Sequence, residues 1–385
     1  MGGHLQAKLI AIYFPQFHAT AENDAWWGQG FTDWDNVKSG QPQYAGHYQP
    51  RVPLDRNYYD QSQLQTLQWQ VELARQHGVY GFCHYHYWFD GQQLLETPTN
   101  LMLDHPEIDF PFCLSWANET WSRRWDGRDN HILMRQTHPP SRDRWKLHYD
   151  YLIRAWRDPR AIKVDGKPVF VIYRPQNIEK IDDMLAYWRS LAQADGLPGL
   201  YFIFQKQYEL AGNQCLQGFD GVFQFQPFEA VNSPDYDVAT RRRSYWLRLL
   251  RALPERYQDV LRSLRAKWVK DLKFHSYEAA WEKIVEIRPH PGLDTFPGAF
   301  VDWDNASRYK NRATVFRGAT PELFGKWMSR LVESMAERAL PEEFIFLNAW
   351  NEWSEGAYLE PDERFGHQYL QALQSALAAK LVKYD

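Results

Sequence analysis

Cysteine is scarce in this sequence, and the three cysteines that occur, Cys83, Cys113 and Cys215, lie far apart. None has the Cys-x-x-Cys spacing of a zinc or redox motif, and three isolated cysteines do not suggest a disulfide framework. We therefore expect buried thiols in a reducing compartment and no zinc site ligated by cysteine.

Long apolar runs are also missing. No stretch approaches the roughly 18 residues that a membrane-spanning helix needs. Lys8 precedes only a short apolar run that continues into Pro15, so no secretory signal is evident. Gly2 follows Met1, but Gln6 stands where a myristoylation signal requires Ser or Thr. The sequence therefore predicts a cytoplasmic protein.

A strong net charge is absent too, because the formal charge is -4 over 385 residues, which argues against a general nucleic-acid binder. The charge is unevenly distributed. Residues 241–273 contain eleven Lys and Arg against three Asp and Glu. We predict that 231–297 is a basic helical insertion with a solvated face; the alternative is peripheral contact of 241–273 with an anionic membrane or a lipid-linked glycan.

Several catalytic motifs do not occur. There is no glycine-rich phosphate loop, no dinucleotide fingerprint and no Gly-x-Ser-x-Gly elbow. His84 and His86 could begin a metal site with Glu119, Asp302 or Asp304 as a third ligand. We favour hydrogen bonds from these histidines to substrate hydroxyls or neighbouring tyrosines, and we predict neither a metal nor a cofactor.

Aromatic residues are abundant, with 18 Trp, 22 Tyr and 22 Phe, or 16% of the chain. Such a content exceeds what a core needs. Aromatic platforms for sugar rings are one explanation, and packing at interfaces is the other.

Short β-prone runs alternate with amphipathic helical patterns along the chain. The eight runs are Lys8–Phe14, Val79–His84, Phe110–Trp116, Pro168–Tyr173, Gly199–Gln205, Gly221–Phe225, Gly298–Asp302 and Glu343–Ala349. Eight such units predict an α/β protein, a single-domain (β/α)₈ TIM barrel over 1–385 with long βα loops. The segment 19–60 is predicted to be a loop over the barrel mouth. A doubly wound open sheet is the competing fold.

Functional residues of a barrel lie at the carboxyl ends of its strands. The predicted strand ends and the 19–60 loop supply amides, imidazoles and aromatic rings, which suit a neutral polyhydroxylated ligand. The candidate substrate-binding residues there are Tyr13, Gln16, Trp26, Trp27, His84, His86, Tyr87, Trp116, Asn118, Glu119, Tyr173, Gln205, Gln224, Asp302, Trp303 and Asn305.

Two glutamates, Glu352 and Glu355, follow the last predicted strand among Trp350, Asn351 and Trp353, which we add to the binding candidates. If the chain turns helically, residues three apart have Cβ atoms roughly 5 to 6 Å from each other. Two carboxyls so close cannot ionise independently, which separates them into an acid and a base. Glycosidic bond cleavage requires such a pair. A solvated loop that caps the next helix is the alternative interpretation.

Long motifs along the chain resemble those of WbsX-type proteins, which are often labelled glycosyltransferases of polysaccharide or O-antigen clusters and are related to glycoside hydrolase family 99, the endo-α-1,2-mannosidases. The motifs are Tyr13-Phe-Pro-Gln-Phe-His18, Glu22-Asn-Asp-Ala-Trp-Trp-Gly28, Gly30-Phe-Thr-Asp-Trp34, Gly46-His-Tyr-Gln-Pro50, Gly81-Phe-Cys-His-Tyr-His-Tyr-Trp-Phe89, Trp116-Ala-Asn-Glu119, Trp303-Asp-Asn305 and Asn348-Ala-Trp-Asn-Glu-Trp-Ser-Glu-Gly-Ala-Tyr-Leu-Glu-Pro-Asp362.

The resemblance implies a (β/α)₈ barrel and a metal-independent site that retains the anomeric configuration. It implies that Glu352 is a base for the substrate 2-hydroxyl and that Glu355 protonates the leaving oxygen. Two departures stand out. Ser354 occupies a position where family 99 usually has His, which bears on mannose specificity, and His84 replaces an expected Tyr of the WbsX pattern.

Three functions remain open on this basis. The first is a retaining glycoside hydrolase acting on α-linked mannose-like or deoxyhexose units of a polysaccharide. The second is a glycosyltransferase of bacterial surface polysaccharide (O-antigen) biosynthesis, and the third is a catalytically inactive carbohydrate-binding protein.

Overall fold

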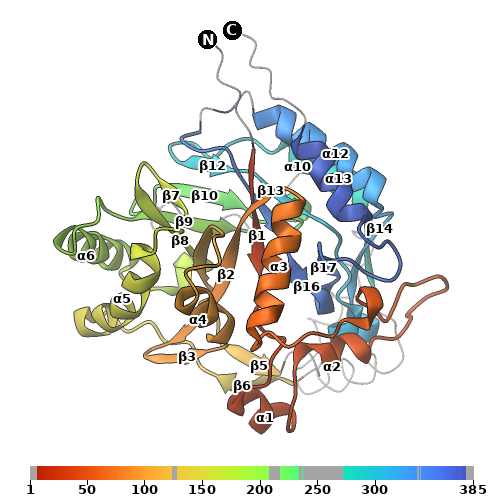
Figure 1. Cartoon of the computed structure of the whole chain (residues 1–385), viewed down its shortest axis with the longest axis horizontal. Coiled ribbons are helices and arrows are strands. Elements are labelled where there is room, and N and C mark those ends of the chain that lie inside the picture. The colour runs from red at the N-terminus through yellow and green to blue at the C-terminus, as the bar shows by residue number, and fades with distance from the viewer. Residues whose placement is uncertain are drawn as a thin grey trace, which may run out of the picture.

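The computed structural model describes residues 7–123, 128–207, 217–233, 236, 272–335, 338 and 340–378. Nine parallel strands form a nearly closed barrel (Figure 1). In spatial order they are β12 (Asp294–Phe296), β10 (Gly221–Gln224), β9 (Tyr201–Lys206), β8 (Lys167–Ile172), β4 (Phe112–Trp116), β2 (Val79–Phe89), β1 (Lys8–Tyr13), β15 (Phe344–Asn348) and β13 (Gly298–Phe300).

The predicted eight-stranded barrel is confirmed, because β12 and β13 are two halves of one extended segment. Pro297 separates them, and its carbonyl accepts a hydrogen bond of 3.0 Å from the Phe346 amide. The first half pairs with β10 and the second with β15, which closes the barrel. A Cβ at Gly298 would lie 1.7 Å from the Gln224 carbonyl oxygen, so only glycine permits this approach.

Helices cover the outside of the barrel. The longer ones are α3 (Leu64–Gln76), α4 (Thr97–Asp104), α5 (Arg142–Arg157), α6 (Ile181–Ala194), α10 (Tyr277–Glu286), α12 (Pro321–Met335) and α13 (Gln368–Leu377). Each presents an apolar stripe to the strands; in α12 the predicted stripe of Phe324, Trp327, Leu331 and Met335 is buried.

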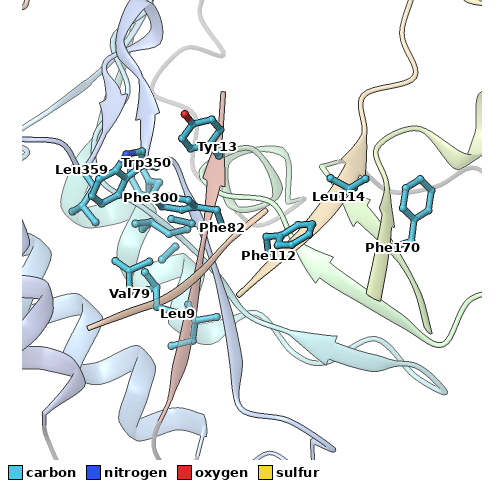
Figure 2. Close-up of a cluster of buried hydrophobic side chains, with 14 of the residues drawn as sticks. Leu9, Tyr13, Val79, Phe82, Phe112, Leu114, Phe170, Phe300, Trp350 and Leu359 are labelled. Atoms are coloured by element: carbon cyan, nitrogen blue, oxygen red, sulfur yellow. The ribbon is translucent and has the colours of Figure 1, made fainter. Parts of the chain in front are cut away.

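The strands are buried on both faces, and successive side chains enter two different cores. On β1, Ile10 and Ile12 point into the barrel, whereas Leu9, Ala11 and Tyr13 belong to the core between strands and helices. Figure 2 shows part of this outer core, with Tyr13 and Leu9 on β1 beside side chains of neighbouring strands.

Short elements gather where the barrel strands end. Helices α1 (Ala21–Trp27) and α2 (Asp33–Lys38) lie there together with the antiparallel pair β5 (Trp121–Arg123) and β6 (Arg128–Met134), away from the chain termini (Figure 1). The smaller elements are β3 (Gln92–Leu94), β7 (Lys163–Val164), α7 (Phe228–Asn232), β11 (Lys273–Ser276), α11 (Ala306–Tyr309), β14 (Thr314–Arg317), β16 (Asn351–Glu352) and β17 (Ala357–Tyr358).

The basic part of the predicted insertion 231–297 falls outside the described residues, since 237–271 are not among them. The described part that follows contains α10 and the barrel strand β12, so the segment after 271 belongs to the barrel. The part of the chain that the structure does describe contains no helix that is both long enough and apolar enough to cross a bilayer.

Candidate active site

A cavity of about 380 Å³ opens at the carboxyl ends of the barrel strands. Side chains from loops after most of the strands line it, which is where barrels place functional residues. Its size falls in the range of small-ligand pockets. Glu352 and Glu355 both lie in this lining, so the two predicted catalytic residues share one cavity.

A tight turn after β15 places the two glutamates. Glu352 ends the short strand β16, which pairs with β17, and Glu355 ends a 3₁₀ turn that spans Trp353–Glu355. Gly356 follows with φ of 67°, and a Cβ there would lie 2.9 Å from the Asp304 backbone nitrogen. The left-handed turn and the close approach therefore require glycine, which returns the chain directly after the second carboxylate.

The guanidinium of Arg308 joins the two carboxylates. Its Nη1 donates to Glu355 Oε1 at 2.9 Å, and its Nη2 lies 2.9 Å from Glu352 Oε1 and 2.9 Å from Asp33 Oδ2. The contact with Glu352 is an ion pair without the alignment of a hydrogen bond. One buried arginine thus stands among three carboxylates, and the planar fork of its guanidinium suits this arrangement.

Asp33 completes this cluster from α2. Its Oδ2 accepts hydrogen bonds from Arg308 and from the Ser354 hydroxyl. Ser307 in turn donates to the Ser354 carbonyl at 2.6 Å. Ser354, one of the two residues between the glutamates, is not part of the cavity lining and ties the turn that carries the glutamates to α2.

Burial dominates the electrostatics of the glutamates. It raises the pKa of Glu352 well above its ordinary value, while Arg308 opposes this and the negative charge of Glu355 adds to it. Burial likewise raises the pKa of Glu355, again against Arg308. Since the groups interact, the pair titrates jointly, and it holds a proton at higher pH than an exposed glutamate would.

Ten of the predicted site residues line the cavity. They are Gln16, Trp26, Trp27, Tyr87, Glu119, Tyr173, Trp303, Asn305, Glu352 and Glu355. Aromatic rings from separate elements meet there: Trp121 contacts both Trp26 and Tyr87 edge to face, with ring centroids 5.9 and 5.0 Å apart. The 19–60 segment thus contributes to the cavity through Trp26 and Trp27.

Several other candidates lie on the outer face of their strands, under the helices. Tyr13 donates to Gln70 at 2.7 Å and stacks on His84. His86 contacts His148, with 2.9 Å between their Nε2 atoms. Burial lowers the pKa of His84 and of His86 to about 3, so both are neutral.

Trp116 and Gln224 face outward by the same alternation, and Trp116 and Trp350 both lie within the outer core. Gln224 donates to the Arg288 carbonyl at 3.5 Å. Gln205 is buried and also lies outside the cavity lining.

The remaining candidates support the cavity from behind. Asn118 exchanges two hydrogen bonds with the Arg174 backbone, and Asn351 does the same with the Phe14 backbone. Trp353 donates to Glu360 at 2.6 Å, and Asp302 pairs with Arg51 at 2.9 Å.

Sequence reasoning missed Arg308, Asp33 and Asn23, and it passed over Tyr85 and Trp121 as lining residues. Tyr85 could have been found, because it precedes Tyr87 by two and so shares its face of β2. Arg308 had one signal, its position three residues after Asn305 at the end of a strand. Among the described residues, no group of three His, Cys, Asp or Glu is placed to hold a metal ion.

Comparison with known proteins agrees with this architecture. The sequence profile described as "Glycosyltransferase WbsX" matches residues 9–373. The chain belongs to this family. Two relatives from Xanthomonas campestris pv. campestris, both described as "Uncharacterized protein WxcX", are 35% and 36% identical over 97% of the chain. The chain spans about half the length of these curated relatives, 50% of each.

Solved structures share the fold of this WbsX family member. A glycoside hydrolase-like protein superimposes with a TM-score of 0.57 at 13% identity, covering 98% of this chain and 95% of the other. The GH99 endo-alpha-mannosidase from Bacteroides thetaiotaomicron gives a TM-score of 0.53 at 13% identity, with 97% of both chains covered. The expected resemblance and the barrel are both confirmed.

Proposed function

We propose that this WbsX family member is a retaining glycoside hydrolase that acts on α-linked mannose-like or deoxyhexose units of a polysaccharide. The observation that supports this best is the pair of buried carboxylates, Glu352 and Glu355, held by Arg308 in an aromatic-lined cavity. Two carboxyls in different surroundings are the minimum that glycosidic cleavage needs.

The roles follow from the resemblance to family 99. Glu352, the base, takes the proton of the substrate 2-hydroxyl, and O2 attacks the anomeric carbon while the glycosidic C–O bond breaks. Glu355, the acid, gives its proton to the leaving oxygen. Water then attacks the anomeric carbon of the 1,2-anhydro sugar, Glu355 takes a proton from that water, and Glu352 returns its proton to O2. Two inversions give net retention.

Exposure suits this division of roles, and contacts with bound substrate set the protonation of the two carboxyls. The Glu355 side chain is 19% exposed and that of Glu352 8%, so Glu355 lies nearer the opening through which water enters. A carboxylate with a raised pKa is a stronger base once it is ionised. The donated hydrogen bond of the 2-hydroxyl favours the ionised form of Glu352, whereas the leaving oxygen, an acceptor, favours protonated Glu355.

The transferase alternative rests on the family's description. A nucleotide-sugar donor would need cations for its diphosphate, and among the described residues two arginines line the cavity. Arg174 pairs with Glu119 at 2.9 Å, and Arg308 pairs with three carboxylates. Because both guanidinium groups already face carboxylates, hydrolysis is the function that we favour.

Product analysis separates these functions. Wild type and Glu355→Gln are incubated with a panel of α-linked bacterial and fungal polysaccharides, and products are followed by mass spectrometry and NMR. We expect oligosaccharides from wild type alone, with new reducing ends that appear first in the α configuration. Sugar transfer from an activated donor without hydrolysis would favour the transferase, and binding without turnover would favour the carbohydrate-binding alternative.

A further inference from the structure

A second cavity, of about 660 Å³, lies behind the catalytic turn. Its walls come from two segments that are joined by backbone hydrogen bonds: Leu54 donates to the Pro361 carbonyl at 3.0 Å, and Glu363 donates to the Val52 carbonyl at 2.9 Å. Trp69, from α3, forms another part of the lining. None of these residues lines the catalytic cavity.

The floor of the second cavity belongs to the catalytic turn. Trp353, which stands between the two glutamates in sequence, is buried there and donates to Glu360 at 2.6 Å. Tyr59 donates to the same carboxylate at 2.8 Å, and Gln70 does so at 2.7 Å. A ligand in this cavity would therefore rest on side chains that hold the turn in place.

The second cavity is lined by Trp69, one of the few described tryptophans that are not fully buried. The structure describes fifteen of the eighteen tryptophans, and eleven of these are buried. Three of the other four, Trp26, Trp27 and Trp121, line the catalytic cavity, and the fourth is Trp69. All four are half-buried, so each described tryptophan that is not fully buried lines a cavity.

The rim offers hydrogen-bonding groups beside the rings. Asp55, Arg56 and Asn57 are exposed, and Tyr58 is half-buried. Asp55 and Arg56 have φ of 55° and 53°, a left-handed conformation that ordinary residues adopt at a cost and that is frequent at binding sites. Another cavity, of about 510 Å³, shares Arg56 and Tyr58 and extends the surface.

We propose that the cavity between Trp69 and residues 55–58 is a second saccharide site, which binds a stretch of polysaccharide away from the reacting bond. A sugar ring has one apolar face that packs on an indole, while its hydroxyls reach carboxylate, guanidinium and amide groups. This combination of Trp69 with Asp55, Arg56 and Asn57 matches such a ligand. The inference rests on the proposed function to the extent that both take the ligand to be a saccharide.

Affinity electrophoresis of the full chain in gels containing soluble α-mannan or a neutral bacterial rhamnan tests the proposal. All proteins carry Glu355→Gln, so that turnover does not change the polymer. We expect Trp69→Ala to weaken retention on the polymer that binds by roughly tenfold, a loss typical of one aromatic contact. Trp69→Phe keeps a ring and restores part of the retention.

Two further variants distinguish a loss of binding from a folding defect. Tyr58→Ala alters the other wall, and we expect it to weaken retention as well. Tyr187→Ala is the matched control, because Tyr187 is half-buried on α6 and lines neither of these cavities. Thermal unfolding confirms that each protein is folded.

The outcomes are distinct from those for the proposed function. Equal retention of the Trp69, Tyr58 and Tyr187 variants would overturn the second site even if wild type hydrolyses the polymer. Loss of retention in the Trp69 and Tyr58 variants would support it even if wild type shows no turnover. Absence of retention of the parent on both polymers would overturn the assignment to a saccharide.

Discussion

Two buried arginines, Arg51 and Arg308, hold clusters of carboxylates at the same end of the barrel, and the surroundings of the carboxylates differ. Arg51 lies 2.9 Å from Asp302 and 3.4 Å from Asp304. His47 and Gln49 each add a hydrogen bond of 2.8 Å to the same oxygen of Asp304. Arg308 instead faces Asp33 and the two glutamates of the cavity.

The number of hydrogen-bond donors separates Asp304 of the first cluster from Glu352 of the second. Burial opposes ionisation of Asp304, but the bonds from His47, Arg51 and Gln49 lower its pKa below the ordinary value. Among the described residues, the cation beside Glu352 Oε1 is Arg308, at 2.9 Å, and burial still raises the pKa of Glu352. A carboxylate saturated with donors stays ionised and structural, whereas one short of donors remains available for proton transfer.

Removing a carboxyl should lower turnover in the Arg308 cluster and stability in the Arg51 cluster. The effect on turnover is expected to be the largest. We expect Glu355→Gln to lower kcat by about 10²- to 10⁴-fold on the polysaccharide that wild type cleaves, because the leaving oxygen loses its proton donor. Steady-state kinetics measure this, with unfolding curves to show that the fold is intact. Turnover within about threefold of wild type would contradict the role of Glu355.

The Arg51 cluster should respond in stability instead. We expect Asp304→Asn to lower the free energy of unfolding by about 3 kcal/mol or more, because Arg51 keeps its buried charge with one partner fewer. Urea unfolding measures the change. The control is Asp150→Asn, whose exposed pair with Lys146 contributes less than about 1 kcal/mol. Equal stability of the two variants would contradict a structural role for the cluster.

Charge removal at Arg308 sharpens the same contrast. Arg308 lowers the pKa of both glutamates, so Arg308→Gln should raise the acid-side midpoint of the pH dependence of kcat/KM by about one unit. Arg308→Lys keeps the charge and should shift it less. Arg51→Lys should leave the midpoint in place. Identical pH profiles for wild type and Arg308→Gln would show that the guanidinium does not act on the pair.

The fold could be predicted from the sequence because strand and helix patterns alternate along it. The turn that carries the two glutamates could be predicted to lie at the cavity because its polar residues follow an apolar strand. The sequence could not show which side chains of each strand point into the cavity. Barrel strands are apolar on both sides, so alternation is hard to see in the sequence. His84, His86 and Tyr87 were all predicted to bind substrate, whereas Tyr85 and Tyr87 are the residues that line the cavity. Only the pairing register with neighbouring strands shows which face of a strand points into the barrel.

Contacts distant in sequence were also beyond prediction. Arg308 donates a hydrogen bond to Asp33, 275 positions away in the sequence, and the pattern around neither residue predicts this contact. Asn351 likewise fixes the end of β1 through Phe14, 337 positions away. The Asn351 contact depends on the pairing of β15 with β1, which joins the last strand of the barrel to the first, and the Arg308 contact joins α11 to α2.

Glu360 lies between Asp304 and Glu352 in this comparison. It accepts hydrogen bonds from Trp353, Gln70 and Tyr59, yet burial raises its pKa to about 7 because no described cation pairs with it. A folded pKa above the unfolded value means that the native state binds more protons between about pH 4.5 and 7. Stability due to this group is therefore present below that range and lost as the pH rises through it.

We expect the free energy of unfolding of wild type to fall between pH 5 and 7.5, and Glu360→Gln to reduce that fall by on the order of 1 to 3 kcal/mol. Urea unfolding at the two pH values measures it. Other buried carboxyls with raised pKa, such as Glu229, contribute in the same direction, so the difference between variant and wild type is the informative quantity. An unchanged fall in Glu360→Gln would mean that its three donors already keep this carboxylate ionised, as His47 and Gln49 do for Asp304.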